Sequence, residues 1–300
     1  MSKENIPIFR RICRKFVYLT APIWSDKTFL RMYFWCNLGY KLNLKSPRTF
    51  NEKLNWLKIY NKHPEYSKMV DKKEAKEYVA SIVGDKYIIP TLAVYNNVED
   101  IDFESLPKQF VLKCTHDSGG IVVCKDKTTL DKEDAIRKLK KGLNSNFVSI
   151  TREYPYKNVI PRIIAEQYME DETGYELRDY KFFCFDGDPK FLFVASDRQK
   201  EGEDTKFDFF DLNWKHIPVR NGHPNAPEQI QKPKNFDEMI DVARKLSKGI
   251  THVRVDLYNC NGNIYFGELT FFHWSGFVSY DPHQYDELFG SYIHLPIDKQ

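Results

Sequence analysis

No stretch of the sequence approaches the roughly 18 consecutive apolar residues that a membrane-spanning helix requires. In the first segment, from Ile6 to Tyr18, three arginines and one lysine interrupt the hydrophobic residues, which argues against a secretory signal peptide. We therefore expect a cytoplasmic protein. The same segment predicts an amphipathic helix that packs on its own domain. Weak peripheral contact of this basic helix with anionic lipid, at the inner face of the membrane, is the alternative.

Common signatures of metal and phosphate chemistry are also missing. The six cysteines form no CxxC pair and the eight histidines form no HExxH pattern, so we expect no structural metal and cysteines that are reduced and mostly buried. The chain contains no GxxxxGK[ST] phosphate-binding loop. A formal net charge of only +3, with basic residues spread along the chain, gives no reason to expect a nucleic-acid partner.

What the sequence does contain is a mixture of helical and strand patterns typical of an α+β protein. In the helical first third, Thr49 and Glu52 form a capping-box pattern, and a second helix is expected to begin at Asp71 and end at Gly84. Strand-like segments then dominate, with antiparallel hairpins around turns such as 186–189. Strands are predicted at 87–95, 110–114, 121–124, 163–169, 180–185 and 190–195, and further helices at 131–141 and from Asn235.

A hairpin near the C-terminus, formed by 252–259 and 263–271, carries an unusual pair of acids. A three-residue turn at 261–263 is preferred, because a two-residue turn would place the acids on opposite faces of the sheet. The expected pairs are Cys260 with Ile264, Tyr258 with Phe266, Asp256 with Glu268, and Arg254 with Thr270. The expected core face holds Val253, Val255, Leu257, Tyr265, Leu269 and Phe271.

Two acids opposed across a sheet repel each other, so this pairing predicts a positive charge between Asp256 and Glu268. Neighbouring oxygen ligands suit Mg²⁺, which usually takes one or two protein carboxylates together with substrate phosphates. Two acids on a solvated sheet face are the alternative.

Basic residues on other strands would supply the charge of a phosphate site. Lys113 ends a short apolar strand and precedes Gly119 and Gly120, whose backbone amides can approach phosphate oxygens; a plain turn is the alternative. Lys181 lies among aromatic residues of a hairpin strand, where a lysine on a water-facing edge strand is the alternative. With Arg198 and Arg254, these lysines and the two acids resemble a nucleoside triphosphate site with a metal ion.

The order of these residues along the chain resembles that of the ATP-grasp superfamily, and most closely that of its TupA-like branch. This branch is named for teichuronopeptide biosynthesis and occurs among cell-surface polysaccharide genes. The resemblance covers most of the chain from about residue 40 onward. It lies in the segments 46–53 (SPRTFNEK), 110–114 (FVLKC), 156–166 (YKNVIPRIIAE), 179–187 (DYKFFCFDG) and 266–271 (FGELTF).

The resemblance implies an ATP-grasp fold, in which two α+β subdomains clasp a nucleotide between antiparallel sheets. The expected divisions are a helical N-terminal region at 1–85, a first subdomain with a Gly-rich lid at 86–165, and a second subdomain with the metal site at 166–300. The implied cofactors are ATP and Mg²⁺.

The resemblance also implies roles for individual residues. Lys113 would contact the α- and β-phosphates, and Lys72, or Lys76 one turn later, would add a second cation. The other implied nucleotide contacts are a mobile lid (His116, Ser118, Gly119 and Gly120), an adenine-recognising hinge (Glu166, Gln167 and Met169), and Asp171 or Glu170 on the ribose. The implied metal ligands are Asp256, Glu268 and Thr270, the last at a position where many ATP-grasp enzymes carry asparagine.

The activity implied by the resemblance is an ATP-dependent carboxylate–amine ligase that works through an acyl phosphate. Lys181, Arg198 and Arg254 would neutralise the transferring phosphoryl group. The partners would be a carboxylate-bearing sugar or glycan and an amine or amino acid. The alternatives are a glycosyltransferase that uses Asp186-Gly-Asp188 as its metal motif, and a nucleotide-binding protein without turnover.

Overall fold

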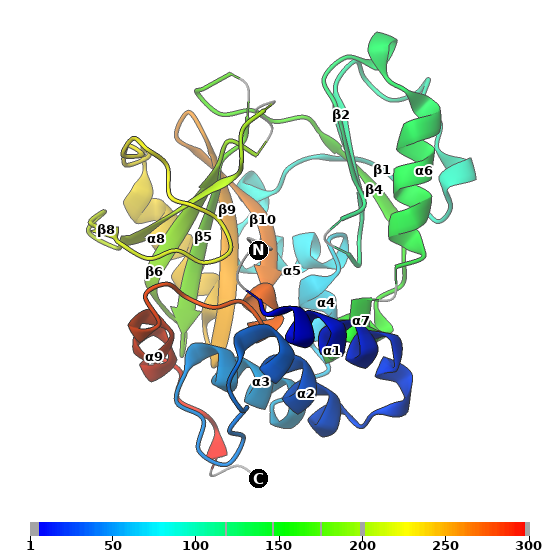
Figure 1. Ribbon diagram of the computed structural model, residues 1–300. Helices are drawn as coiled ribbons and strands as arrows, with labels where there is room; N and C mark the ends of the chain where they lie inside the picture. The colour runs from blue at the N-terminus through cyan, green and yellow to red at the C-terminus, as the bar shows by residue number, and fades with distance from the viewer. Residues whose placement is uncertain (1–5, 118, 146, 175, 199–201, 298–300) are drawn as a thin grey trace.

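In the computed structural model, which describes residues 6–117, 119–145, 147–174, 176–198 and 202–297, the chain forms two lobes, each built on an antiparallel sheet (Figure 1). The smaller sheet has the order β1-β4-β2-β3, with β1 Thr91–Tyr95, β2 Phe110–Cys114, β3 Ile121–Cys124 and β4 Ile163–Gln167. The larger sheet has the order β10-β9-β5-β6-β7-β8, with β5 Asp179–Phe185, β6 Asp188–Ser196, β7 Lys206–Asp211, β8 His216–Ile217, β9 His252–Cys260 and β10 Asn263–Thr270. The predicted α+β class is confirmed.

The helices begin and end largely where capping patterns predict. The capping box of Thr49 and Glu52 is formed, and the helix that follows it starts at Phe50. Gly84 caps the helix that begins at Glu74, three residues after Asp71, whose carboxylate accepts hydrogen bonds from the first backbone amides. The α-helices are α1 Ile8–Leu19, α2 Asp26–Leu38, α3 Phe50–Tyr60, α4 Tyr66–Val70, α5 Glu74–Val83, α6 Lys132–Leu143, α7 Phe147–Thr151, α8 Phe236–Ser247 and α9 Gln284–Ser291. Among the described residues, no helix has the length and apolar character needed to cross a bilayer.

The larger sheet is covered by helices on both faces. On one face Phe50 of α3 packs against Phe183 of β5, with ring centroids 5.8 Å apart. On the other face Phe236 of α8 stacks on Phe182 at 5.9 Å. One hydrophobic core joins the N-terminal helices to this sheet. Because side chains alternate along β5, Lys181 shares the face of Phe183, and it lines the cavity between the lobes.

The smaller lobe has a core of its own, formed between its sheet and α6. Along β2, Phe110, Leu112 and Cys114 are buried in this core, whereas Val111 and Lys113 are only partly buried and belong to the other face. The alternation therefore directs Lys113 toward the cleft.

The C-terminal hairpin differs from the predicted register at its turn. Asn261 and Gly262 form a two-residue turn with φ values of 57° and 97°, so Cys260 pairs with Asn263 rather than Ile264, and Tyr258 pairs with Tyr265 rather than Phe266. A register shift at Gly267 then restores the predicted pairs of Asp256 with Glu268 and Arg254 with Thr270.

The reason for this difference is the burial of Phe266. Its side chain is 3% exposed and occupies the core position predicted for Tyr265, which is only partly buried. The bulge at Gly267 lets the strand bury Phe266 and still turn Glu268 to the opposite face.

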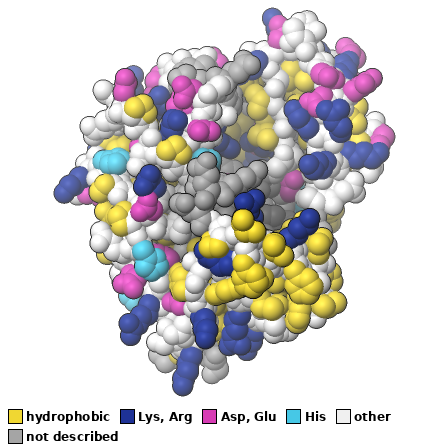
Figure 2. Space-filling view, in the orientation of Figure 1, with side chains coloured by type: hydrophobic (Ala, Val, Ile, Leu, Met, Phe, Trp, Pro, Cys, Tyr) yellow, Lys and Arg dark blue, Asp and Glu magenta, His cyan; other side chains and the backbone are white. Residues whose placement is uncertain are grey.

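The helix α1 packs on α2 through a narrow and mostly polar side. Val17 is its one buried side chain, and Arg14 donates a hydrogen bond to Asn37 of α2 at 3.3 Å. The hydrophobic residues on the other side of α1 remain exposed, and Figure 2 shows a cluster of hydrophobic side chains over this part of the molecule.

Candidate active site

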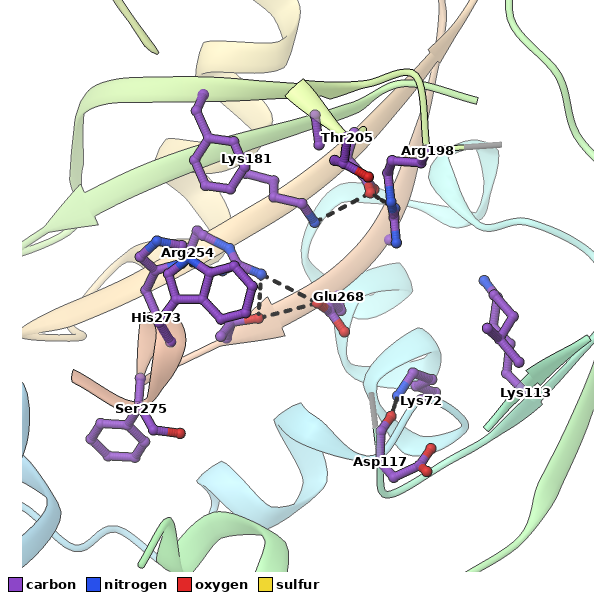
Figure 3. A pocket seen from close by; sticks show the side chains of 18 of the residues that line it. Lys72, Lys113, Asp117, Lys181, Arg198, Thr205, Arg254, Glu268, His273 and Ser275 are labelled. Carbon is purple, nitrogen blue, oxygen red and sulfur yellow. Dashed lines mark hydrogen bonds and ion pairs between the residues drawn. The ribbon is translucent and has the colours of Figure 1, made fainter. Parts of the chain in front are cut away.

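A cavity of about 580 Å³ lies between the two lobes, within the size range of sites for small molecules. Figure 3 shows side chains from both lobes facing this space: Lys113, Lys72 and Asp117 lie across it from Lys181, Arg198, Arg254 and Glu268. The sequence-predicted residues that line it are Lys72, Lys113, Gly120, Lys181, Arg198, Arg254, Glu268 and Thr270.

The positive charge expected between the two hairpin acids is the guanidinium of Arg254. Its Nε and Nη2 donate hydrogen bonds to the two oxygens of Asp256, both at 2.7 Å. The same Nη2 lies 3.3 Å from Oε1 of Glu268 and 3.0 Å from the hydroxyl of Thr270. Lys181 also forms an ion pair with Asp256. Arg254 and Lys181 therefore relieve the repulsion that the strand pairing would otherwise create.

A second acid of the large sheet, Asp179, holds the remaining cations of this wall. Its carboxylate forms ion pairs with Arg198 and with Lys181, the latter at 3.4 Å. Asp179 is almost completely buried, whereas the side chain of Arg198 is 47% exposed. Buried acids thus fix the direction of the cations, whose charge faces the cavity.

The electrostatic environment keeps Glu268 ionised. Burial raises its pKa, but the positive charges of Lys181, Lys72 and Arg254 outweigh this effect and lower the pKa to about 2. Since 36% of its side chain remains exposed, Glu268 offers a permanent negative charge to the cavity.

The donors present fit a Mg²⁺ ion only in part. Among the described residues, no group of three or more His, Cys, Asp and Glu side chains converges on a point that could hold a metal. Glu268 has accessible oxygen, and the hydroxyl of Thr270 lies 3.3 Å from it. Asp256 is fully buried and both its oxygens accept from cations. This set fits a Mg²⁺ ion held by one carboxylate and by substrate phosphates, with Asp256 positioning Arg254 and Lys181.

On the small-lobe side, two lysines share one acid. Glu166 forms ion pairs with Lys113, at 2.7 Å, and with Lys76. Burial raises the pKa of Glu166, but the charges of both lysines overcome this and lower it to about 2. Lys76 also donates to the carbonyl of Ile89 and lies outside the cavity wall, whereas Lys72 lines the cavity. Of the two lysines expected as the second cation, Lys72 lines the cavity and Lys76 does not, and the role of either toward a phosphate stays a prediction.

Two described residues of the glycine-rich loop, Asp117 and Gly120, line the edge of the cavity. The amide of Gly120 donates to both oxygens of Asp117, at 3.1 and 3.0 Å, and Lys72 donates to the carbonyl of Asp117. A Cβ atom on Gly120 would lie 2.5 Å from the Sγ atom of Cys114, so this position requires glycine. Gly119 is exposed and His116 is buried, while Ser118 lies outside the described residues. Movement of this loop as a lid stays a prediction.

The residues expected at the hinge do not themselves line the cavity, although Glu166 pairs with Lys113, which does. Gln167 is exposed, and its backbone N–H donates a hydrogen bond to the carbonyl of Pro90 at 3.0 Å. Met169 is partly buried. The buried carboxylate of Asp171 accepts from the backbone amides of Thr173 and Arg178 within its own loop. Adenine and ribose recognition by this segment stays a prediction.

Part of the cavity was not predicted from the sequence. Ser275 lines it in a left-handed conformation with φ of 54°, and its hydroxyl donates to the buried carboxylate of Glu153. Burial raises the pKa of Glu153 to about 7. Behind this pair, the ammonium group of Lys58 donates to the carbonyls of Thr151 and Ser275, both at 2.7 Å. The available signal was the segment His-Trp-Ser-Gly immediately after the acid-bearing hairpin.

An aromatic wall completes this end of the cavity. Trp274, also left-handed with φ of 48°, is 39% exposed, and its ring centroid lies 5.9 Å from that of His223 and 6.2 Å from that of Phe207. The indole packs closely on Gly222, where a Cβ atom would lie 3.3 Å from the ring. The cavity thus has one end rich in charge and another rich in aromatic surface.

One family model and several solved structures are similar to this chain. The family model described as TupA-like ATPgrasp matches residues 52–294. No curated protein matches the chain. Similar solved structures include a D-alanine–D-alanine ligase from Bacillus anthracis complexed with ATP, at 15% identity and a TM-score of 0.38, covering 67% of this chain and 53% of that one. Another is the ATP-grasp ligase PsnB complexed with minimal precursor, Mg and ADP, at 12% identity and a TM-score of 0.40, covering 74% and 57%.

A D-alanine–D-alanine ligase from Helicobacter pylori is similar at 12% identity and a TM-score of 0.38, covering 73% of this chain and 61% of that one. This chain therefore spans less than two thirds of the length of each of these three proteins. The family match covers more than three quarters of the 300 residues. The chain belongs to the TupA-like ATP-grasp family, and its fold is an ATP-grasp fold.

Proposed function

We propose that this protein is an ATP-dependent carboxylate–amine ligase that forms an amide through an acyl phosphate. The observation that carries the proposal is the convergence of five cations on a single cavity. Lys113 comes from the small lobe, Lys72 from the turn between α4 and α5, and Lys181, Arg198 and Arg254 from the large sheet and the segment after it. Cations on both sides of a cleft match the charge of a triphosphate, and Glu268 offers a place for the accompanying Mg²⁺.

In the first step, an oxygen of the substrate carboxylate would attack the γ-phosphorus of ATP. The bond from this phosphorus to the β-bridging oxygen breaks, giving ADP and an acyl phosphate. Lys181, Arg198 and Arg254 would stabilise the charge on the transferring phosphoryl group, and buried acids hold them in place before ATP arrives. Mg²⁺, held by Glu268 and the phosphates, would supply further charge neutralisation.

In the second step, the amine nitrogen would attack the carbonyl carbon, the carbon–oxygen bond to phosphate breaks, and the nitrogen must lose a proton. Glu153 is suited to accept it, because its carboxylate is joined to the cavity through Ser275 and its pKa of about 7 lies near neutral pH. No covalent nucleophile of the protein is required.

As the substrate that supplies the carboxylate, we propose a carboxylate-bearing sugar of a cell-surface polysaccharide or its precursor. As the amine substrate, we propose an amino acid or a simple amine. The aromatic wall of Trp274, His223 and Phe207 supports a ring-shaped acceptor, because flat aromatic faces pack well against the apolar side of a sugar ring. The family likeness to teichuronopeptide biosynthesis points to the same class.

The glycosyltransferase alternative receives no support from Asp186 and Asp188. They flank Gly187 in the turn between β5 and β6, and they are not among the described residues that line the cavity. Asp186 lies 2.6 Å from His294, and Asp188 pairs with Lys190 at 2.8 Å. Both acids therefore belong to the turn of this hairpin and not to the cavity.

The test is to incubate the protein with ATP, Mg²⁺ and pooled uronic acids and amines or amino acids, and to measure ADP and phosphate. The ligase predicts ADP and phosphate in equal amounts, released only when both a carboxylate and an amine are present. Release of UDP from a nucleotide-sugar would contradict the ligase, and ATP binding without any ADP would indicate a nucleotide-binding protein without turnover.

A further inference from the structure

An amphipathic helix usually packs on its protein through its apolar side, but α1 packs through a side that carries basic residues. Four residues spaced as one face, Arg10, Cys13, Arg14 and Val17, turn toward α2, and of these only Val17 is fully buried. The guanidinium of Arg10 lies so close to Gly39 that it would contact a Cβ atom added at that position. Arg14 donates a hydrogen bond to Asn37. The inward side of α1 is therefore half basic.

The outward side carries the large hydrophobic residues. Ile8, Phe9, Ile12, Phe16 and Leu19 recur at helical spacing and are 59–74% exposed, and Ile23 in the turn after α1 is also 74% exposed. We call these six residues the α1 patch. Figure 2 shows hydrophobic side chains gathered here, with Lys and Arg side chains beside them. A contiguous apolar patch of this kind marks an interaction site more often than an ordinary surface.

The charges around the patch indicate what covers it. The sequence of α1, IFRRICRKFVYL, has four basic residues and no acid. Arg11 and Lys15 are exposed and lie on the helix surface next to the apolar stripe. A bilayer with anionic headgroups complements this arrangement. Its acyl chains match the apolar stripe, and its negatively charged headgroups match Arg11 and Lys15.

A second copy of the chain fits less well. In a two-fold symmetric dimer the same patch meets itself, so Arg11 and Lys15 of each copy would approach like charges. We infer that α1, with Ile23, is a docking surface for an anionic membrane. The helix lies in the plane of the headgroups with its apolar stripe toward the acyl chains, and Arg11 and Lys15 contact lipid phosphates. This inference does not rest on the proposed ligase activity.

The test is flotation of the full chain with vesicles of phosphatidylcholine alone and of phosphatidylcholine mixed with phosphatidylglycerol. The wild type is expected to float with the anionic vesicles and to remain largely unbound with the neutral ones. The double variant Arg11→Glu/Lys15→Glu should bind the anionic vesicles at least about fivefold more weakly for each basic residue lost. A matched control, Lys140→Glu/Lys141→Glu on α6, should bind like the wild type.

A second pair of variants examines the apolar stripe. Phe9→Ser/Phe16→Ser should lose vesicle binding, whereas Ile160→Ser, which changes a residue that is 62% exposed elsewhere on the surface, should not. All of these positions are exposed, so each variant should remain folded at the assay temperature, which thermal unfolding checks. A wild type that stays unbound with both vesicle types, or α1 variants that bind as well as their controls, would overturn the inference. So would a wild-type dimer that Phe9→Ser/Phe16→Ser converts to a monomer.

Discussion

Glu268 and Asp256 are paired across two strands, yet their surroundings give them different chemical roles. Asp256 is fully buried and accepts from both Arg254 and Lys181, whereas Glu268 keeps an exposed carboxylate beside the hydroxyl of Thr270. The sequence predicts the pair and the need for a positive charge between them. It does not show that a side chain two residues away provides that charge, because Arg254 reaches Asp256 only once the strand fixes both on one face.

Replacement of Glu268 by glutamine should reduce Mg²⁺-dependent ADP formation by about a hundredfold or more, since a fixed charge at the phosphates is lost. The fold should remain, because 36% of the side chain is exposed and the amide can still bond to Thr270. ADP release at saturating Mg²⁺ is the measurement, and Glu172→Gln on the same lobe is the control. Full activity of Glu268→Gln would remove this residue from the metal site.

Lys113 and Lys76 offer a matched comparison, because both hold Glu166 but only Lys113 lines the cavity. Lys113→Met should weaken ATP binding at least about tenfold, through the loss of a charge at the phosphates. Lys76→Met should leave ATP affinity nearly unchanged and instead lower stability by about 1–3 kcal/mol, since buried acceptors lose their donor. Calorimetric titration with ATP checks both, and equal affinities for the two variants would show that Lys113 is structural.

The pair of Glu153 and Ser275 should appear in the pH dependence of the reaction. A carboxylate accepts a proton only when ionised, and burial raises the pKa of Glu153 to about 7. The rate of amide formation is therefore expected to rise as the pH increases through 7. Glu153→Gln should be slower and should lose this rise. If the variant keeps the wild-type profile of kcat against pH, another group accepts the proton.

At the scale of elements, strands and helices with strong local patterns are the parts that the sequence predicts best. The capping box before α3, the β5–β6 hairpin and β2 all lie where patterning places them. The β7 strand, Lys206–Asp211, was not predicted, and the turn between β9 and β10 has two residues rather than three. Local propensity allowed either turn, and the burial of Phe266 against the large sheet selected the observed one.

The pairing of β2 with β4 should make the small lobe sensitive to acid through Glu166. Its folded-state pKa is about 2, below the ordinary value of 4.5, so its ion pairs stabilise the lobe above about pH 4.5 and are lost as the pH falls toward 2. The difference between the folded-state and ordinary pKa values corresponds to about 3 kcal/mol of stability. Glu166→Gln should be less stable than the wild type near neutral pH.

The gap in stability between Glu166→Gln and the wild type should narrow as the pH falls, because protonation removes the same charge from the native protein. Urea unfolding at a series of pH values from about 6 to about 3 provides the measurement. A gap that stays constant over this range would mean that Glu166 contributes through packing and not through its charge.

At the scale of the whole molecule, the two hydrophobic cores separate the small lobe from the large sheet and the N-terminal helices. Lys72, Lys113, Lys181, Arg198 and Glu268 come from both sides of this division and meet only in the cavity. Their convergence could be expected from the resemblance to the ATP-grasp superfamily. The end formed by Trp274, Ser275 and Glu153 could not, because it depends on left-handed backbone conformations and on contacts between residues more than a hundred positions apart.

The most direct test of acyl-phosphate chemistry follows an oxygen atom of the substrate carboxylate into the released phosphate. Pooled uronic and amino acids labelled with ¹⁸O in their carboxylates are incubated with the protein, ATP, Mg²⁺ and amines, and the released phosphate is analysed by mass spectrometry. An acyl phosphate passes one carboxylate oxygen to phosphate when the amine displaces it, so labelled phosphate is the predicted result. Release of phosphate that carries no label from the acceptor would contradict the proposed ligase mechanism.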